Sequence, residues 1–130
     1  MTPDQLAEYV QTTFPRTGPF KPFAHYDPDG DCIEFFVSPE SFVAERVDTW
    51  VTVYHGEHSN EVIGSLIKGV SKLLEQFPGL VIDIECGRVR IAHILRARAW
   101  ASGDELVRKS YKKIIQVADA ESIIAELQCA

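Results

Sequence analysis

The sequence predicts an α+β protein in which a mostly antiparallel sheet of about four strands is covered on one face by helices. Two observations carry this prediction. Runs of β-forming residues that alternate in polarity come in pairs, and short turn-rich stretches join the members of each pair. Stretches with helical spacing stand before, between and after the pairs, which gives the order α-β-β-α-β-β-α-α. Strands joined by tight turns favour antiparallel pairing, with the helices gathered on one side.

The first half of the chain predicts one helix and one strand pair. A helix is expected over Thr2–Phe14, because Pro3 suits a first helical turn and apolar residues then recur on one side. A proline-rich connector follows. Cys32–Val37 and Phe42–Tyr54 are rich in β-formers and alternate in polarity, and residues 38–41 between them are turn formers. We expect this pair to be a hairpin or a meander.

The middle of the chain carries its clearest helical pattern. Val62–Phe77 repeats apolar residues at helical spacing and ends at Pro78 and Gly79. Gly64 and Gly69 weaken the start of that helix, so its first turn is alternatively the end of a strand. Close packing against the sheet would be one reason for glycine at these positions.

A second strand pair and two more helices are expected after it. Leu80–Glu85 and Arg88–Ala99 alternate in polarity around a turn at residues 86–87 and predict a hairpin. Residues 102–105 have the spacing of a capping box, which opens a helix. Asp119 is the expected cap of a last short helix.

The composition is that of one ordinary globular domain spanning residues 1–130. The chain is 45% apolar and 25% charged, and its length matches a single domain with its own core. No apolar run approaches the roughly 20 residues of a bilayer span, and the first residues lack the features of a signal peptide. Three scattered cysteines without an export signal indicate reduced thiols. We therefore expect a cytoplasmic protein with no membrane association.

The net charge of −6 disfavours a nucleic-acid binder, because such proteins gather lysine and arginine against phosphates. The charge is uneven along the chain. Residues 1–65 carry 11 acidic and 3 basic side chains, whereas residues 66–130 carry 8 acidic and 10 basic ones. The folded surface is expected either to have two faces of opposite sign or to mix the charges where the halves interleave.

The densest acidic cluster is a candidate calcium site. Asp27, Asp29 and Asp31 alternate with Pro28 and Gly30, as oxygen ligands alternate in a calcium loop. The spacing departs from that motif, since the glycine is fourth in the loop rather than sixth. A turn before a strand explains the same residues, because each of them has a backbone reason to stand in a turn.

Histidines and a cysteine supply the other chemical candidates. His55 and His58 flank a carboxylate within four residues and are candidate transition-metal ligands, although a solvated loop is the favoured explanation. His93 is expected on the apolar face of a strand, where a hydrogen-bonded core histidine is favoured over an acid or base. Cys86 is a candidate nucleophile only if the fold brings a base beside it. No phosphate-binding glycine loop is present, so no cofactor is predicted.

Four arginines form the candidate binding surface: Arg88, Arg90, Arg96 and Arg98. On an extended strand they would leave the same face, forming an arginine ladder. The ladder would be extended by basic residues of the following helix, namely Arg108, Lys109, Lys112 and Lys113. Such a face suits a partner's acidic patch or nucleic acid, whereas the alternative is a solvated face paired with surplus carboxylates. Trp50 and Trp100 are interface anchors or, as we favour, core residues.

Residues 26–69 resemble a small bacterial domain family of unknown function. Members begin with a Tyr-Asp-x-x-x-Asp-x-Leu-Tyr strand, which Tyr26, Asp27, Asp31 and Ile33 resemble. A second strand and a Val-x-Gly-x-Glu-Ile stretch follow in the family, and residues 51–54 and 61–64 are similar in placement. The whole chain also resembles small hypothetical proteins common in bacterial, particularly cyanobacterial, genomes. The resemblance implies a sheet-forming domain and carries over no functional residue.

These patterns favour a non-catalytic binding or regulatory module that acts through protein–protein contacts, as a homodimer or with another protein. One alternative is an antitoxin-like or immunity-like protein whose acidic half covers a basic partner. The other is a small-molecule enzyme that uses a His/Cys pocket or a histidine-based metal site. The enzyme is the less favoured reading, because no convergent set of polar groups is evident in the sequence.

Overall fold

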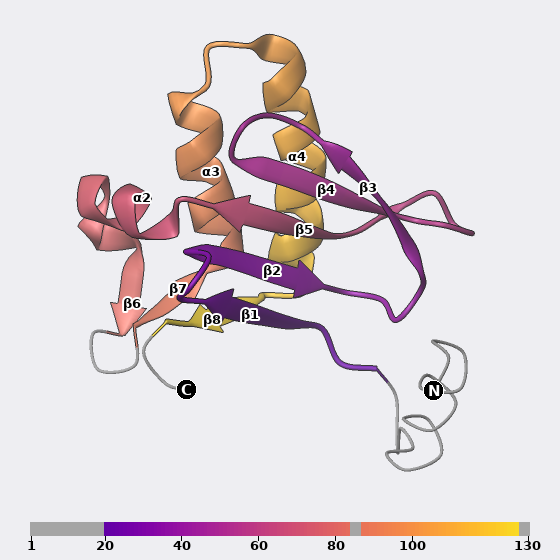
Figure 1. Cartoon of the computed structure of the whole chain (residues 1–130), viewed down its shortest axis with the longest axis horizontal. Coiled ribbons are helices and arrows are strands. Elements are labelled where there is room, and N and C mark those ends of the chain that lie inside the picture. The colour runs from indigo at the N-terminus through magenta and orange to yellow at the C-terminus, as the bar shows by residue number, and fades with distance from the viewer. Residues whose placement is uncertain (1–19, 84–86, 128–130) are drawn as a thin grey trace.

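A computed structural model describes residues 20–83 and 87–127, together with the fold they form (Figure 1). The predicted helix Thr2–Phe14 lies outside the described residues, and so does Cys86. The described part is α+β, as predicted, with a five-stranded antiparallel sheet, a small three-stranded sheet and three α-helices. Within it, no helix is long and apolar enough to cross a membrane.

The large sheet has the strand order β1-β2-β5-β4-β3, and every neighbouring pair is antiparallel. Two hairpins, β1–β2 and β3–β4, flank the central strand β5. The strands are β1 Phe23–Asp27, β2 Cys32–Phe36, β3 Phe42–Arg46, β4 Val51–Gly56 and β5 Val62–Lys68. The acidic turn at residues 28–31 joins β1 to β2, which confirms its interpretation as a turn.

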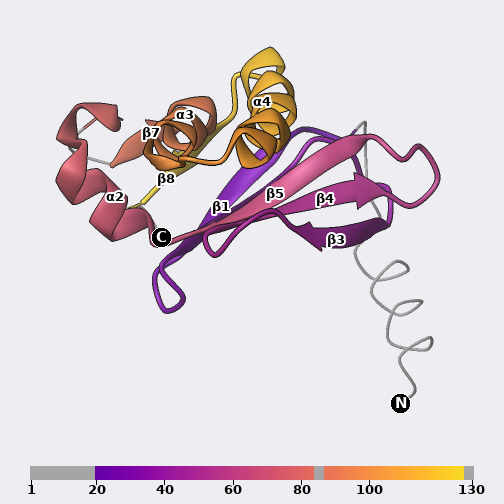
Figure 2. The same cartoon turned by 90° about the horizontal axis from the view of Figure 1, so that it is seen from above.

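The small sheet has the order β6-β7-β8 and is also antiparallel. Its strands are β6 Val81–Asp83, β7 Arg88–Arg90 and β8 Ile124–Glu126. The helices are α2 Val70–Gln76, α3 Ile91–Ala101 and α4 Glu105–Ala120, and a short 3-10 turn, η1, covers Pro78–Leu80. Figure 2 shows α3 and α4 lying over one face of the large sheet.

The core lies between that face and the two helices. Alternate residues of β2, β4 and β5 meet the buried sides of α3 and α4, and their burial supplies the main stabilising term. The largest fully buried side chains are Tyr111, Phe35, Ile33, Ile67, Leu73, Ile91, Ile94, Leu95 and Ile114. The other face of the sheet is aromatic: Phe23, Phe36, Tyr54 and Phe42 follow one another across it with ring centroids 4.2–5.8 Å apart.

The predicted strand Phe42–Tyr54 is wrong as a single element, because a tight turn divides it into β3 and β4. The carboxylate of Asp48 accepts hydrogen bonds from the backbone N–H groups of Trp50 and Val51, both at 2.8 Å. Asp side chains stabilise turns in this way. The predicted hairpin of β2 with this segment is wrong too, since β2 pairs with β1 and β5.

The predicted helix Val62–Phe77 is wrong in its first half, where Val62–Lys68 is the central strand β5. A central strand is covered on both faces, so its nearly continuous apolar run imitates a buried helix. Gly69, with φ 66°, breaks the strand and starts α2. The weakening effect of Gly64 and Gly69 on a helix suggests the end of a strand at the start of this segment, and the structure has a strand there.

The second predicted hairpin exists only as the short pair β6–β7. The strand Arg88–Ala99 is wrong beyond Arg90, because Ile91–Ala101 forms α3. Its alanines, leucine and arginines favour helix, and Ile91, Ile94 and Leu95 satisfy helical spacing as well as alternation. The order α-β-β-α-β-β-α-α therefore undercounts the strands.

Three smaller differences concern the ends of elements. Asp104 rather than Ser102 caps α4, since its carboxylate accepts from the N–H groups of Leu106 and Val107. The last predicted helix is wrong: α4 continues to Ala120, and the chain then turns at Ser122, φ 49°, into β8. Asp119 therefore lies within α4 and caps nothing. Strand β1 escaped prediction because its five residues include the polar His25 and Asp27.

We predict that Gly64→Ala destabilises the protein by roughly 2–3 kcal/mol, the scale of an over-packed core. Gly64 lies between Phe36 and Tyr54 in the sheet, and those rings stack across it at 5.4 Å. A Cβ at this position would stand 2.2 Å from the carbonyl oxygen of Phe35, so the backbone must move. Urea unfolding measures the loss. Gly79→Ala is the matched control, because nothing lies within 4 Å of its Cβ; equal effects of the two would contradict the prediction.

Candidate functional site

Trp100 is the most exposed aromatic side chain in the described part, at 74% of its surface. It projects from the end of α3 and has a hollow on each side. Covering the exposed apolar surface of this tryptophan with a partner would be favourable, and tryptophan is enriched at binding sites. Trp100 therefore marks the first surface to consider.

The larger hollow, of about 580 Å³, lies between α3 and α4. Its lining combines three cations with apolar surface: Arg96, Ala99, Trp100, Arg108, Lys112, Ile115 and Gln116. The second hollow, of about 440 Å³, is lined by Phe77, Leu80, His93, Arg96, Ala97 and Trp100. Phe77 supports the indole edge-on, with ring centroids 5.8 Å apart. We call the two hollows and their lining the Trp100 surface.

Helical spacing puts these side chains together. Arg96 and Trp100 are four residues apart on α3, and Arg108 and Lys112 are four apart on α4. Residues at this spacing share one face of a helix. The opposite side of α4 is buried through Tyr111 and its apolar neighbours, so the basic side has to face outward. The amphipathic pattern of α4 thus positions half of the surface.

The Trp100 surface is positively charged in a chain of net charge −6. Arg96 pairs with Asp119 at 3.3 Å, and the Nε of Arg108 donates to the Ser102 carbonyl at 2.8 Å. Lys112 makes no ion pair with a described residue, and no carboxylate is among the lining residues. The Arg96–Asp119 pair is exposed and worth about 0–1 kcal/mol, so an incoming carboxylate can replace it.

A polar network beneath the surface fixes α3 and α4 to the sheet. The Nη2 of Arg98 donates to the carbonyls of Lys68 at 2.9 Å and Gly69 at 2.8 Å, and its guanidinium lies 4.5 Å from the Trp50 ring centroid. The hydroxyl of Tyr111 donates to Asp48 at 2.7 Å. Burial raises the pKa of Tyr111, and the hydrogen bond to Asp48 raises it further, so this hydroxyl stays protonated.

The structure separates the four predicted surface arginines. Arg88 and Arg90 lie on β7, whereas Arg96 and Arg98 lie on α3, so the predicted ladder is wrong. Arg88 pairs with Glu126 at 3.2 Å, and Arg98 is half-buried against Trp50. A ladder needs the period of two of a strand, and the helix rotates these side chains to different sides. Arg96 alone reaches the Trp100 surface.

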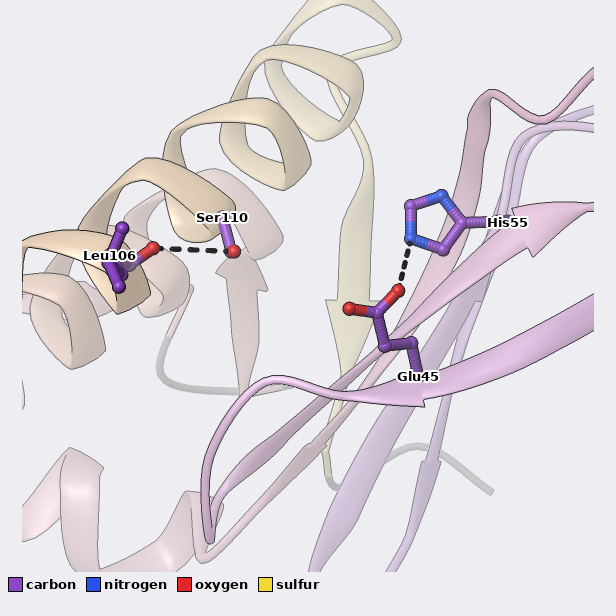
Figure 3. A network of polar contacts seen from close by, with 4 residues as sticks. All are labelled: Glu45, His55, Leu106 and Ser110. Carbon is purple, nitrogen blue, oxygen red and sulfur yellow. Dashed lines mark hydrogen bonds and ion pairs between the residues drawn. The ribbon is translucent and has the colours of Figure 1, made fainter.

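The basic residues of α4 are divided as well. Arg108 and Lys112 face Trp100, whereas Lys109 and Lys113 line a separate hollow of about 310 Å³ towards the sheet, with Glu45 and His55. The Nε2 of His55 lies 3.3 Å from a carboxylate oxygen of Glu45, its diagonal neighbour across the β3–β4 pair. Figure 3 shows this contact together with the hydrogen bond that the Ser110 hydroxyl donates to the Leu106 carbonyl.

His55 and His58, the predicted metal ligands, differ in their surroundings. His55 is paired with Glu45, while the backbone N–H of His58 donates to Glu40 at 2.6 Å. Hydrogen bonds from the backbone and hydroxyl of Ser59, with that from His58, hold the pKa of Glu40 below its ordinary value. Across residues 20–83 and 87–127, no group of three histidine, cysteine or acidic side chains is placed to hold a metal ion.

The aspartates of the β1–β2 turn act on the protein itself. Asp27 accepts a hydrogen bond from the N–H of Asp29 at 3.0 Å, as in an ordinary Asx turn. Asp31 accepts from the Tyr26 hydroxyl at 2.9 Å and from the N–H and hydroxyl of Ser71 at 3.0 and 2.7 Å. Burial raises the pKa of Tyr26 to about 12, and the hydrogen bond to Asp31 acts in the same direction. These contacts tie the turn to the start of α2.

The remaining chemical candidates lie apart from one another. His93 lies on α3 rather than on a strand. It is one of the residues that line the second hollow, and it is only partly buried, so the prediction of a core histidine is wrong. Cys86 lies outside the described residues. Burial and nearby carboxylates raise the pKa of Cys32, which disfavours a reactive thiolate. Ser65 is fully buried and donates to the carbonyl of Thr52 at 2.7 Å.

Sequence reasoning missed the importance of Trp100. Core positions were favoured for Trp50 and Trp100, and this is wrong, because they are 42% and 74% exposed. The sequence feature that could have indicated this surface is the four-residue spacing of Arg96 and Trp100, which share a face only if residues 91–101 are helical. The strand prediction concealed it.

Comparison of the chain with family models, with curated proteins and with solved structures finds no match. The resemblance of residues 26–69 to a bacterial domain family therefore stays a prediction. The function has to be inferred from the Trp100 surface itself.

We predict that Arg98→Lys destabilises the protein by about 2–3 kcal/mol, because an ammonium cannot make both carbonyl contacts while stacking on Trp50. Urea unfolding measures the change. Arg90→Lys, an exposed arginine on β7, is the control and should change stability little. A variant as stable as the control would show that the network is dispensable.

We predict that Asp31→Asn removes part of the loss of stability in acid. Burial alone would raise the pKa of Asp31, but hydrogen bonds from Ser71 and Tyr26 hold it below its ordinary value. A folded pKa below the unfolded one contributes stability above the unfolded value, and this is lost as the pH falls below about 4. Unfolding of wild type and variant at neutral pH and at about pH 3 tests this.

Asparagine suits the positive φ of 49° at residue 31, so the backbone is retained. Asp29→Asn, an exposed neighbour in the same turn, serves as the control. An acid dependence in Asp31→Asn as steep as in the wild type would contradict the role assigned to Asp31.

Proposed function

We propose that this protein is a non-catalytic binding module that takes an acidic, partly apolar segment of a partner protein on the Trp100 surface. The observation that carries the proposal is the 74% exposure of Trp100 between two hollows whose charged lining residues are all basic or histidine. The partner is described by its chemistry: carboxylates for the cations, and an aliphatic or aromatic side chain for the hollows.

The energetics of interfaces support this assignment. Tryptophan and arginine are the residues most enriched at binding hot spots, where removing one side chain costs 1 kcal/mol or more. Arginine pairs with carboxylates in two-pronged geometry, which adds specificity to the charge attraction. The hollows on both sides of Trp100 allow a partner to cover both faces of the indole, which increases the apolar area removed from water.

The surface favours binding over catalysis. Among its described lining residues His93 carries the one imidazole, and it stands beside Phe77 and Leu80 without a described nucleophile. An enzyme needs several convergent polar groups with matched pKa values. The sign of the charge also favours an acidic partner over the basic partner of the antitoxin-like hypothesis. We propose a reducing compartment such as the cytoplasm, which the free thiol of Cys32 supports.

Fluorescence titration tests the proposal. In a Trp50→Phe background Trp100 is the sole tryptophan, so its emission reports binding at this surface. We expect short peptides that alternate Glu with Leu to shift the emission, with an affinity that falls as salt rises. Matched peptides with Gln in place of Glu should bind at least about tenfold more weakly. Arg108→Glu should have an effect of the same size.

Lys109→Glu is the matched control variant, since it makes the same charge change on the side of α4 that faces away from Trp100. Equal weakening by the two variants would mean that only net charge matters and would contradict a defined site. Tight binding of a single-stranded oligonucleotide in place of the acidic peptide would overturn the choice of a protein partner.

A further inference from the structure

Among residues 20–83 and 87–127, the large sheet leaves the edge at β3 open. β1 and β3 are its edge strands, and β1 lies beside β8, with a hollow between them lined by residues of both. No described strand hydrogen-bonds the outer edge of β3, and all five of its residues are exposed. Natural proteins protect open edges, because unpaired N–H and C=O groups recruit another strand. Strand β3 begins with Phe42 and Val43, which offer little such protection.

The direction of each backbone group on β3 follows from contacts at its two ends. Glu57 donates its N–H to the Ser41 carbonyl at 2.8 Å, and Val47 donates to the Val51 carbonyl at 2.9 Å. Antiparallel partners alternate between hydrogen-bonded and non-hydrogen-bonded pairs. Residues 41, 43, 45 and 47 therefore direct their N–H and C=O groups towards β4. Phe42, Ala44 and Arg46 direct theirs to the open side.

We propose that a second copy of this chain adds its β3 antiparallel to this edge, with Ala44 opposite Ala44 of the second copy. Two outward-facing residues must stand opposite each other for both of their hydrogen bonds to form. The set 42, 44 and 46 is symmetric about Ala44, so the register centred there uses every outward donor and acceptor of both strands. A two-fold axis at Ala44 joins the two large sheets into one continuous sheet.

One pair of side chains is complementary in the same register. Phe42 stands opposite Arg46 of the second copy on the aromatic face of the sheet, where a guanidinium can lie over the ring. Phe42 is already packed on Tyr54 at 4.2 Å, so its ring is held in place. Val43 stands opposite Glu45, and the residue that meets itself on the axis is a small alanine.

Neighbouring registers are worse. Centring the pair on Glu45 puts two like charges directly opposite, which is destabilising. Centring it on Val43 leaves the outward groups of Arg46 unpaired. The backbone groups would accept any extended strand, so the choice of a second copy rests on the side chains: this register places Phe42 of each strand opposite Arg46 of the other and puts no like charges opposite each other.

The substitution Ala44→Pro tests the dimer without disturbing the fold of the single chain. The Ala44 N–H points outward, so Ala44→Pro removes no hydrogen bond within the chain, and edge strands tolerate proline at such positions. The same change deletes the central donors of the proposed pairing. Ala44→Val is the control, because it keeps the N–H and favours strand.

Light scattering over a dilution series, with native mass spectrometry, measures the outcome on the full chain. Five paired residues a side form a small interface, so we expect a dimer of twice 14.6 kDa that dissociates on dilution. Ala44→Pro should weaken it at least about a hundredfold, while Ala44→Val stays dimeric. The circular dichroism of the proline variant should match that of the wild type, and so should its thermal unfolding at a dilution where both are monomeric.

Three results would overturn the proposal. The first is a wild type that remains monomeric up to about 1 mM, where even an association of about 4 kcal/mol is half complete. The second is a dimer that Ala44→Pro leaves intact, and the third is one that Ala44→Val abolishes. None of these results bears on peptide binding at the Trp100 surface, since the two surfaces share no residue.

Discussion

The arrangement of sheet and helices depends on the guanidinium of Arg98. It reaches from α3 to the two carbonyls where β5 ends and α2 begins, and it stacks on Trp50 in the β3–β4 turn. Burial lowers the pKa of Arg98, and the nearby carboxylates of Asp48 and Asp31 oppose that change. One side chain thus fixes the relative positions of three parts of the chain: the β3–β4 turn, the junction of β5 with α2, and α3.

This contact has a cost that the fold accepts. The Nε of Arg98 is buried without a hydrogen-bond partner among the described residues, and such groups are rare in native proteins. Gly69 has to be glycine both for its positive φ and because a Cβ there would stand 2.7 Å from the arginine nitrogen. The polar network therefore requires an unpartnered buried nitrogen on Arg98 and a glycine at position 69.

The Trp100 surface inherits its shape from this network. Arg98 is two residues from both Arg96 and Trp100, and Tyr111 is next to Lys112. Anchoring the inner sides of α3 and α4 to the sheet fixes the outer sides, so the hollows keep their width without a partner. A preformed site loses less conformational entropy on binding than one that has to be ordered.

Local patterns predicted the class of the fold, the acidic turn and the amphipathic helix α4. They failed where one pattern fits two structures. The apolar run Val62–Lys68 is a strand because β2 and β4 pair with it on either side. The residues of the run alone do not indicate these two partners. Residues 91–101 satisfy both periods, and tertiary contacts select the helix. The candidate site was hidden by the same ambiguity, since Arg96 and Trp100 come together only on a helix.

The position of β5 also determines the order in which the sheet can form. The hairpins β1–β2 and β3–β4 involve only near neighbours in sequence, but neither can contact the other until β5 enters between them. Strands β4 and β5 form a local hairpin around residues 57–61, but pairing β5 with β2 closes the longer loop of residues 37–61, which is slower than forming a hairpin. During synthesis, β2 and β4 therefore wait with unpaired inner edges until Val62–Lys68 has left the ribosome. That interval, rather than the finished fold, is when the chain is most exposed to aggregation and to capture by chaperones.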